Sequence, residues 1–452
     1  MDTGICPDKA AALYAAEAER YRHTHPQSGR LAARTHGHWL YGVPLHWMQD
    51  WSMPHPLFVE RAQGVHIRDV DGLDYVDFCL GDTGAMFGHS PPAVAHALAQ
   101  QAAQGLTTML PSADAAAVGE LLSQRFGLPY WQSALSASDA NRFLIRWARA
   151  ITGRSQILVF NGCYHGTVDD VFVDLVDGVP QSRDSLLGQV YPLTAHTRVV
   201  EFNDLAALEA ALQDGQVACV LAEPAMTNIG MVLPEDGFWA AAQDLFRRYG
   251  TLLIMDETHT ISSGPGGYCR RHGIDADMLV LGKPVAGGLP TAVYGMSAAV
   301  AERAMATKAA APPGHSGIGT TLSGNLLSLA AMRATLEQLM SDAAYEHMLA
   351  LADYVADGLE RHIADLQLPW CVTRLGARCE FQFSPTPPVN GSEAGARLDD
   401  ALSHTIHLYL LNRGVLITPF HNMLLVCPQT QQTDADRLLS VWREAVQTLK
   451  AA

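Results

Sequence analysis

Short apolar runs alternate with helical segments between about residues 90 and 335, and this alternation limits the fold more than any other feature. The four clearest runs span residues 156–160, 217–222, 252–255 and 278–281. Short apolar strands that are separated by helices are typical of a mostly parallel sheet covered by helices. We therefore expect an α/β fold in this part of the chain.

The flanking segments predict a second, smaller domain. Residues 65–78 alternate in strand fashion about Asp71-Gly72, which predicts a hairpin. A long helical stretch at 326–364 precedes strands and a final helix from about Asp434, a mixture typical of an α+β domain. With 452 residues, the chain is too long for one small core. We expect an N-terminal arm and part of the small domain at 1–70, a large domain at 71–335 and a C-terminal small domain at 336–452.

Composition excludes several classes of partner. The formal net charge is −16, which argues against nucleic acid and anionic membranes. No apolar stretch is long enough to span a bilayer, and no secretion signal is visible at the start of the chain. The eight cysteines are scattered without zinc spacing, so no metal site is expected. Reduced thiols and a cytoplasmic location follow as expectations.

Polar or reactive residues follow each of the four apolar runs. Residues 161–166 follow the first, Glu223 the second, Asp256 the third and Lys283 the fourth. Ligands of open α/β sheets bind beyond the carboxyl ends of the strands. We therefore expect these residues to share one active site.

Lys283 is one of only four lysines and stands between an apolar run and a glycine-rich turn. An amine that is desolvated there can be neutral and nucleophilic, although a lysine reaching to solvent is the alternative. Asp256, for which a helix cap or surface acid is the alternative, ends the neighbouring run. A lysine and a carboxylate on adjacent strands suit pyridoxal phosphate: the amine bonds to the cofactor aldehyde, and the acid keeps the ring nitrogen protonated. Once released, the lysine can move a proton.

The motif around these two residues resembles a known signature. Asp256-Glu257-Thr258 precedes Lys283 by twenty-seven positions (283 − 256), and Gly287-Gly288-Leu289-Pro290 follows it. This pattern resembles the class III aminotransferases, fold-type I pyridoxal-phosphate enzymes that include ω-transaminases, β-amino-acid transaminases and glutamate-1-semialdehyde aminomutases. Segments 87–91, 161–166, 223–224 and 321–325 also resemble that family. The resemblance covers roughly residues 60 to 430 and implies the fold-type I architecture and pyridoxal 5'-phosphate as cofactor.

The resemblance also implies a phosphate site. Ser136, Ala137 and Ser138 stand at a helix start where the family holds the cofactor phosphate, although an ordinary helix N-cap is the alternative. Asp139 replaces the family's glutamate and has a shorter reach. Thr321 is implied as a phosphate contact from a neighbouring subunit, so a homodimer with shared active sites is expected.

Ring contacts follow from the same resemblance. Tyr164 is implied as the residue that stacks on the cofactor ring, with His165 behind it, and Glu223 as an acid near the ring. An ion pair with an arginine is the alternative for Glu223. Thr258 and His259 replace the family's usual Val-Gln pair, which would place a small hydroxyl against the ring face.

The substrate pocket is inferred from departures. Trp47 and Phe420-His421 stand where related β-amino-acid transaminases have arginines that bind a carboxylate, and neither can replace an arginine fork. An apolar pocket is therefore expected, although a plain core role is the alternative for the aromatic arm. The residues assigned to this pocket are Trp47, Trp51, His165, Phe420 and His421.

We expect a transaminase that moves an amino group from a hydrophobic primary amine or amino acid to a keto acid, such as pyruvate or 2-oxoglutarate, by a ping-pong mechanism. Two alternatives stay open. One is an aminomutase of the glutamate-1-semialdehyde type, and the other is a cofactor-binding relative without catalytic activity.

Overall fold

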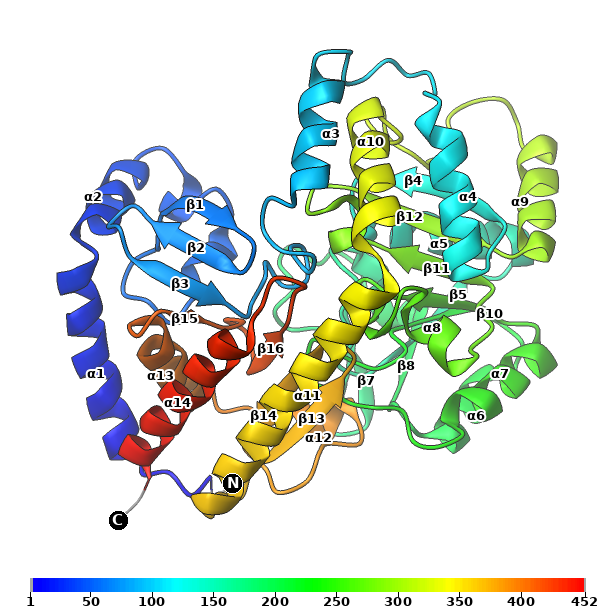
Figure 1. Ribbon diagram of the computed structural model, residues 1–452. Coiled ribbons are helices and arrows are strands. Elements are labelled where there is room, and N and C mark those ends of the chain that lie inside the picture. Colours follow the sequence, from blue (N-terminus) through cyan, green and yellow to red (C-terminus); the bar gives the residue numbers. More distant parts are fainter. Residues whose placement is uncertain (1–2, 451–452) are drawn as a thin grey trace. The chain divides into compact units, whose positions relative to one another are not determined.

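The computed structural model describes residues 3–450, which group into two compact units (Figure 1). Unit 1 takes the residues up to Pro91, Glu346–Pro387 and those from Arg397 on. Unit 2 takes Pro92–Tyr345 and Pro388–Ala396. The domain ranges expected from the sequence (1–70, 71–335 and 336–452) remain a prediction about functional domains.

A seven-stranded sheet forms the centre of unit 2, in the order β4-β12-β11-β10-β9-β5-β8. Strand β12 runs antiparallel to both of its neighbours, and the other described pairings are parallel. The mostly parallel sheet is therefore confirmed, and the four apolar runs are strands β5, β9, β10 and β11. The strands are β4 (Tyr130–Ala134), β5 (Gln156–Phe160), β8 (Thr197–Val200), β9 (Val217–Ala222), β10 (Leu252–Asp256), β11 (Met278–Leu281) and β12 (Ala292–Met296).

The central strands are apolar because both faces of the sheet are covered. Every residue of β9, β10 and β11 is buried. Helix α5 (Ala137–Thr152) packs across the sheet against β4, β9, β10, β11 and β12. Each fully buried Leu, Ile or Val side chain contributes about 1.5–3 kcal/mol relative to exposure, so the sheet is a rigid base for the loops at its edge.

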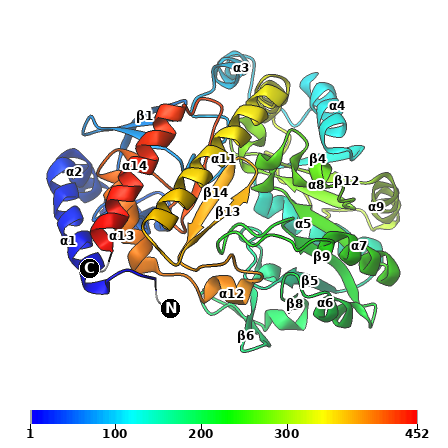
Figure 2. The same ribbon diagram turned by 60° about the horizontal axis from the view of Figure 1, so that its bottom comes forward.

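Helices and short strands complete unit 2. Figure 2 shows α6 and α7 side by side, in agreement with their contacts. The other elements are α3 (Pro92–Ala102), α4 (Asp114–Phe126), α6 (Leu205–Leu212), α7 (Phe238–Tyr249), α8 (Gly267–His272), α9 (Ala298–Ala310), α10 (Leu326–Ala334) and α12 (Gly391–Gly395), with strands β6 (Val173–Val176) and β7 (Val179–Ser182).

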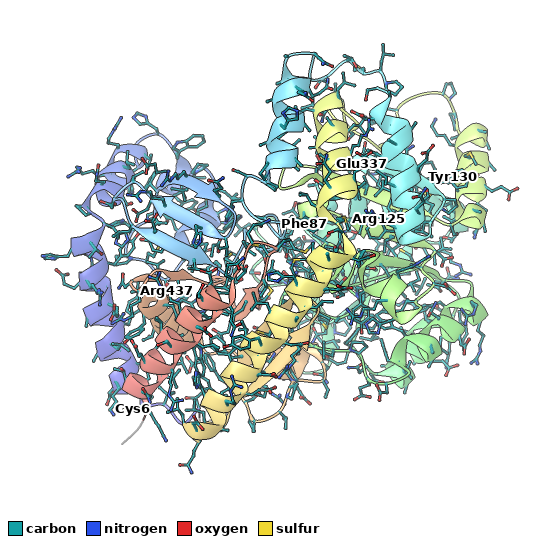
Figure 3. All side chains as sticks on the ribbon, viewed as in Figure 1. Cys6, Phe87, Arg125, Tyr130, Glu337 and Arg437 are labelled. Carbon is teal, nitrogen blue, oxygen red and sulfur yellow. The ribbon has the colours of Figure 1, made fainter. Side chains whose placement is uncertain are left out.

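The long helical stretch predicted at 326–364 is interrupted. Helix α10 passes into a π-helical turn at Thr335–Leu339, and α11 (Asp342–Asp365) then begins. Arg125, labelled in Figure 3, donates hydrogen bonds to the carbonyls of Leu336 and Met340, the latter at 2.8 Å. These bonds satisfy carbonyl groups where the regular helix stops.

Unit 1 contains the predicted hairpin, because β2 pairs antiparallel with β3. Its strands form two sheets, β1-β2-β3-β15 and β13-β14-β16, and α1, α13 and α14 pack together. No helix within residues 3–450 is long and apolar enough to cross a membrane. The elements are α1 (Pro7–Thr24), α2 (Pro26–Thr35), β1 (Val59–Gln63), β2 (His66–Asp69), β3 (Asp74–Asp77), β13 (Cys371–Leu375), β14 (Arg378–Gln382), α13 (Asp400–Leu411), β15 (Val415–Leu416), β16 (Met423–Leu425) and α14 (Gln432–Leu449).

Candidate active site

The carboxyl ends of four neighbouring parallel strands bring the predicted residues to one edge of the sheet. Asp256 is the last residue of β10, and Lys283 begins a short 3-10 helix just after β11. Glu223 follows β9, and the loop 161–166 follows β5. Because β10 lies between β11 and β9, the acid and the lysine come from adjacent strands, as the sequence predicted.

Asp256 is a buried carboxylate with four hydrogen-bond donors. Its Oδ2 accepts from Asn141 Nδ2 at 2.8 Å and lies 3.0 Å from His165 Nδ1. Its Oδ1 accepts from the backbone N–H and the hydroxyl of Thr258 at 3.1 and 2.6 Å. Burial by itself raises the pKa of Asp256, but the bonds from His165, Thr258 and Asn141 outweigh it and lower the pKa to about 2. The carboxylate is therefore charged at neutral pH.

His165 is the counter-ion of Asp256. Burial lowers its pKa, whereas the hydrogen bonds to Asp256 and Cys163 raise it, and the net result is a pKa of about 10. Within residues 3–450, the buried Nε2 of His165 has no hydrogen-bond partner. Buried polar atoms nearly always have a partner, so this orphaned nitrogen fits a site that a ligand completes.

Lys283 lies in an unusual backbone conformation next to the start of α5. Its φ angle is +41°, in the left-handed region that few residues other than glycine adopt. A Cβ on Gly282 would lie 2.9 Å from the Cβ of Ala137, so the absence of a side chain lets the two segments approach. The Nζ of Lys283 lies 2.6 Å from Nε2 of His259, which is buried.

The first turn of α5 is held against the loop that follows β5. Ser136 caps the helix through a bond from Asp139 N at 3.2 Å. Ser138 Oγ accepts from Thr167 N at 3.0 Å, and a Cβ on Gly166 would lie 2.0 Å from that oxygen. The backbone N–H groups at such a helix start suit a phosphate, whether or not Ser136 also acts as the cap.

Two departures from the family pattern have local structural roles. Asp139 pairs with Arg142 at 2.6 Å and with the Ser136 hydroxyl, so its carboxylate serves the helix start. The Thr258 hydroxyl donates to Asp256, and its position against the ring face stays a prediction.

Glu223 and Tyr164 also lie at this edge of the sheet. The carboxylate of Glu223 accepts hydrogen bonds from Thr227 and Asn228. These donors, rather than an arginine, are its partners. The pKa of Glu223 is raised to about 7, mainly because the carboxyl group is buried. Tyr164 is 42% exposed on the loop after β5, so its ring is accessible for stacking.

Four of the remaining predicted residues belong to unit 1, and Thr321 belongs to unit 2. Trp47 and Phe420 are partly exposed in unit 1 and meet edge to face, with ring centroids 5.7 Å apart. His421 is buried with Nδ1 3.0 Å from Glu380 Oε1, and Trp51 packs against a core cluster of unit 1. Their assignment to a substrate pocket stays a prediction. Thr321 is exposed in unit 2.

Sequence reasoning missed two contacts. Asn141 was not singled out, although it lies on the buried stripe of α5 with Leu144 and Ala148, where a polar residue is a signal. His259 was noticed only as a departure, and its contact with Lys283 was not foreseen.

Together these residues fit pyridoxal phosphate. The start of α5 can hold a phosphate, Asp256 offers a charged acceptor to a ring nitrogen, and Lys283 offers an amine. The tight approaches at Gly166 and Gly282 bring the three groups to one edge of the sheet.

Comparison with known proteins gives close matches over nearly the whole chain. A crystal structure of a glutamate-1-semialdehyde aminomutase from Pseudomonas aeruginosa PAO1 is 49% identical, covers 99% of this chain and 100% of that chain, and superposes with a TM-score of 0.97. A variant of that enzyme in complex with PMP is 48% identical, with the same TM-score of 0.97 and coverage of 99% and 100%. A glutamate-1-semialdehyde 2,1-aminomutase from Anaeromyxobacter sp. (strain Fw109-5) is 35% identical over 80% of this chain and 84% of its own length.

These similarities correct one expectation. Transfer of an amino group from an amine to a separate keto acid was our main interpretation of the sequence. The relatives at 35% and 49% identity are aminomutases, so that interpretation is wrong and the aminomutase alternative is favoured.

The family itself is as expected. The family model "Aminotransferase class-III" matches residues 47–445. That range contains Asp256, Lys283 and the other strand-end residues described above. The chain therefore belongs to the class III aminotransferases, fold-type I enzymes whose cofactor is pyridoxal phosphate.

Proposed function

We propose that the protein is an aminomutase that exchanges the amino and oxo groups of neighbouring carbons within one substrate, as in the glutamate-1-semialdehyde type. The observation that carries the proposal is the 49% identity with such an enzyme along 99% of the chain. Lys283 and the buried Asp256 stand at the ends of adjacent strands. This placement supports catalysis over the silent alternative, because a relative without activity would be free to lose the lysine.

Each residue then has a defined task. When bound, pyridoxal phosphate supplies an aldehyde for amines and a protonated ring that withdraws electrons. Lys283 holds the cofactor through its amine and, once released, accepts and returns a proton at Nζ. Asp256 accepts a hydrogen bond from the ring nitrogen, and His165 and Asn141 keep that carboxylate charged and fixed.

The cofactor is oriented by its two ends. The first turn of α5, with Ser136, Ala137 and Ser138, holds the phosphate. Tyr164 stacks on the ring, and Glu223 lies near it, with a pKa that burial brings close to neutrality. In this proposal, the edge-to-face pair of Trp47 and Phe420 contributes an apolar surface to the substrate pocket.

We also propose a homodimer as the active unit. Thr321 lies beside a hollow of about 700 Å³ whose lining includes Met109 and Leu110. Met109 is 79% exposed, Leu110 71% and Leu322 50%. Exposed apolar side chains that gather on one surface often mark a contact with another protein, and a second copy of this chain would remove them from water. Sedimentation should give a dimer, and a fully active monomer would contradict the proposal.

The test uses one substrate and no acceptor. The holoenzyme is incubated with glutamate-1-semialdehyde, or with 2-amino-4-phenylbutanal as an apolar analogue, in the absence of any keto acid. Exchange of the two groups gives 5-amino-4-oxopentanoate or 1-amino-4-phenylbutan-2-one, which mass spectrometry with fragmentation distinguishes from the substrate.

Lys283→Ala is the matched negative control, and Lys308→Ala on the exposed face of α9 is the positive one. We expect product with the wild type and with Lys308→Ala, and none with Lys283→Ala. Absence of product from both amino aldehydes would overturn the proposal.

A further inference from the structure

His259 is placed to control the amine that the proposed function uses. Its Nε2 lies 2.6 Å from Nζ of Lys283. We propose that His259 is a positioning residue for Lys283: when the lysine is not bonded to the cofactor, the imidazole accepts a hydrogen from the amine and so fixes the direction of its lone pair. This inference rests on the proposed function, in which Lys283 exchanges a proton with the substrate.

The histidine side of the contact is firmly held. His259 is 5% exposed and follows Thr258, whose backbone N–H and hydroxyl both donate to Asp256. On its other side, the carbonyl of His259 accepts a hydrogen bond from Ser262 N at 3.2 Å. Because the backbone is tied on both sides, the imidazole is supported in its place next to the lysine.

The lysine side is held as well. Gly282, which packs close to Ala137, precedes Lys283, and Pro284 follows it with a restricted φ angle. The carbonyl of Gly282 accepts from Val285 N at 3.1 Å, which closes the turn around the lysine. Nζ of Lys283 and Nε2 of His259 therefore meet at 2.6 Å from two backbone segments that are each held by hydrogen bonds or close packing.

The contact differs in kind from the glutamine that the family usually has at this position. A glutamine oxygen can accept the same hydrogen, but an amide does not titrate near neutral pH. An imidazole nitrogen can accept a hydrogen bond only while it carries no proton. His259 therefore couples the orientation of the amine to the protonation of a second group.

Other titratable groups at this edge are Glu223 after β9, Asp256 at the end of β10 with Glu257 next to it, and His165 after β5. Helix α8 packs against residues 260–263, which follow His259, and it adds Tyr268, Cys269, Arg270, Arg271 and His272. Asp256 and His165 are paired with each other. The elements packed against residues 283–286 are β12, α10 and the π-helical turn. Their titratable or charged residues are Tyr294, Arg333 and Glu337, with Arg333 paired to Glu337 and Asp114 at the surface.

The experiment measures the amine directly. The full-length protein is loaded with pyridoxamine phosphate, which leaves the lysine unbonded, and is pulse-labelled with acetic anhydride between about pH 6 and about pH 9. Peptide mass spectrometry gives the labelling of Lys283 relative to exposed Lys308, and the chain's four lysines make the assignment simple. We expect the labelling of Lys283 in the wild type to change with pH differently from that in His259→Gln, because an imidazole can gain a proton and cease to accept, whereas the amide accepts the hydrogen throughout.

Turnover provides the second readout. His259→Gln should stay within about threefold of the wild type, whereas His259→Leu, which cannot accept a hydrogen, should lose about tenfold, equivalent to about 1.4 kcal/mol. Identical labelling profiles in the wild type and His259→Gln would overturn the proposal, and so would a His259→Leu variant as active as His259→Gln. The labelling result does not depend on whether either amino aldehyde is a substrate. Failure of the proposed function can therefore be distinguished from failure of the proposal about His259.

Discussion

The close approach of Gly166 to Ser138 predicts a large and separable effect of one methyl group. Gly166 has a φ of +80°, and a Cβ there would lie 2.0 Å from Ser138 Oγ and 2.8 Å from Ser138 Cβ. The backbone strain of Gly166→Ala costs about 1 kcal/mol. Forcing the side chains apart adds about 1–3 kcal/mol. The expected total is therefore about 2–4 kcal/mol.

Gly178→Ala is the matched control. Gly178 has nearly the same φ, +77°, and nothing lies within 4 Å of its added Cβ. Its cost is the strain alone, a loss of about 2–4 °C in the midpoint of thermal unfolding. Gly166→Ala should lower the midpoint at least twice as far, and it should release the cofactor faster during dialysis because the first turn of α5 is displaced.

A double-mutant cycle isolates the clash. In a Ser138→Gly background, the hydroxyl and the Cβ that obstruct the new methyl group are absent, but the Cα of residue 138 still lies 2.9 Å from it. Gly166→Ala should therefore cost less than in the wild type, by about 1–2 kcal/mol. Thermal unfolding of the four cofactor-loaded proteins, followed by circular dichroism, gives the coupling. Equal costs for Gly166→Ala and Gly178→Ala, or a coupling near zero, would refute the reasoning.

Three further predictions follow from the described charges and rings. Because the pKa of His165 is raised, its ion pair with Asp256 stabilises the fold fully below pH 6.5, and this stabilisation is lost as the pH rises through about 10. In Asp256→Asn, the midpoint of thermal unfolding should fall less steeply over that alkaline range. An unchanged slope would contradict this prediction. Burial raises the pKa of Glu223 from 4.5 to about 7, so the wild type loses about 3 kcal/mol of stability as the pH rises through that window. Glu223→Gln should not lose stability over that pH range. Parallel pH profiles of the melting midpoint in the wild type and in Glu223→Gln would rule out this prediction. With Trp47 and Phe420 lining the pocket, kcat/KM should be about tenfold higher for 2-amino-4-phenylbutanal than for glutamate-1-semialdehyde, because burying an unpaired carboxylate is costly. The reverse order would show that another residue binds the carboxylate.

The sequence predicted the sheet well because fully buried parallel strands are apolar throughout. Residues 217–222 and 278–281 match β9 and β11 residue for residue. The interruption between α10 and α11 was not foreseen, because it depends on hydrogen bonds from Arg125, more than two hundred positions earlier in the chain. A local pattern carries no signal of such a long-range bond.

The candidate site was predictable to the extent that it lies at strand ends. Asp256 and Lys283 each follow an apolar run, so their neighbourhood could be inferred from topology. Asn141 reaches Asp256 from the interior of a helix, 115 positions away, and only its place on a buried stripe could have indicated it. The choice between an aminomutase and a transaminase was beyond motif reasoning, since both use the same lysine and acid.

The positive φ of Lys283 has a consequence for sequence drift. A residue with a side chain costs about 1 kcal/mol or more in this conformation relative to glycine. Selection for folding alone would therefore favour glycine at position 283. The fold therefore carries a local cost at position 283 that is explained by the need for the amine at the end of β11, as is typical of strained residues at functional sites.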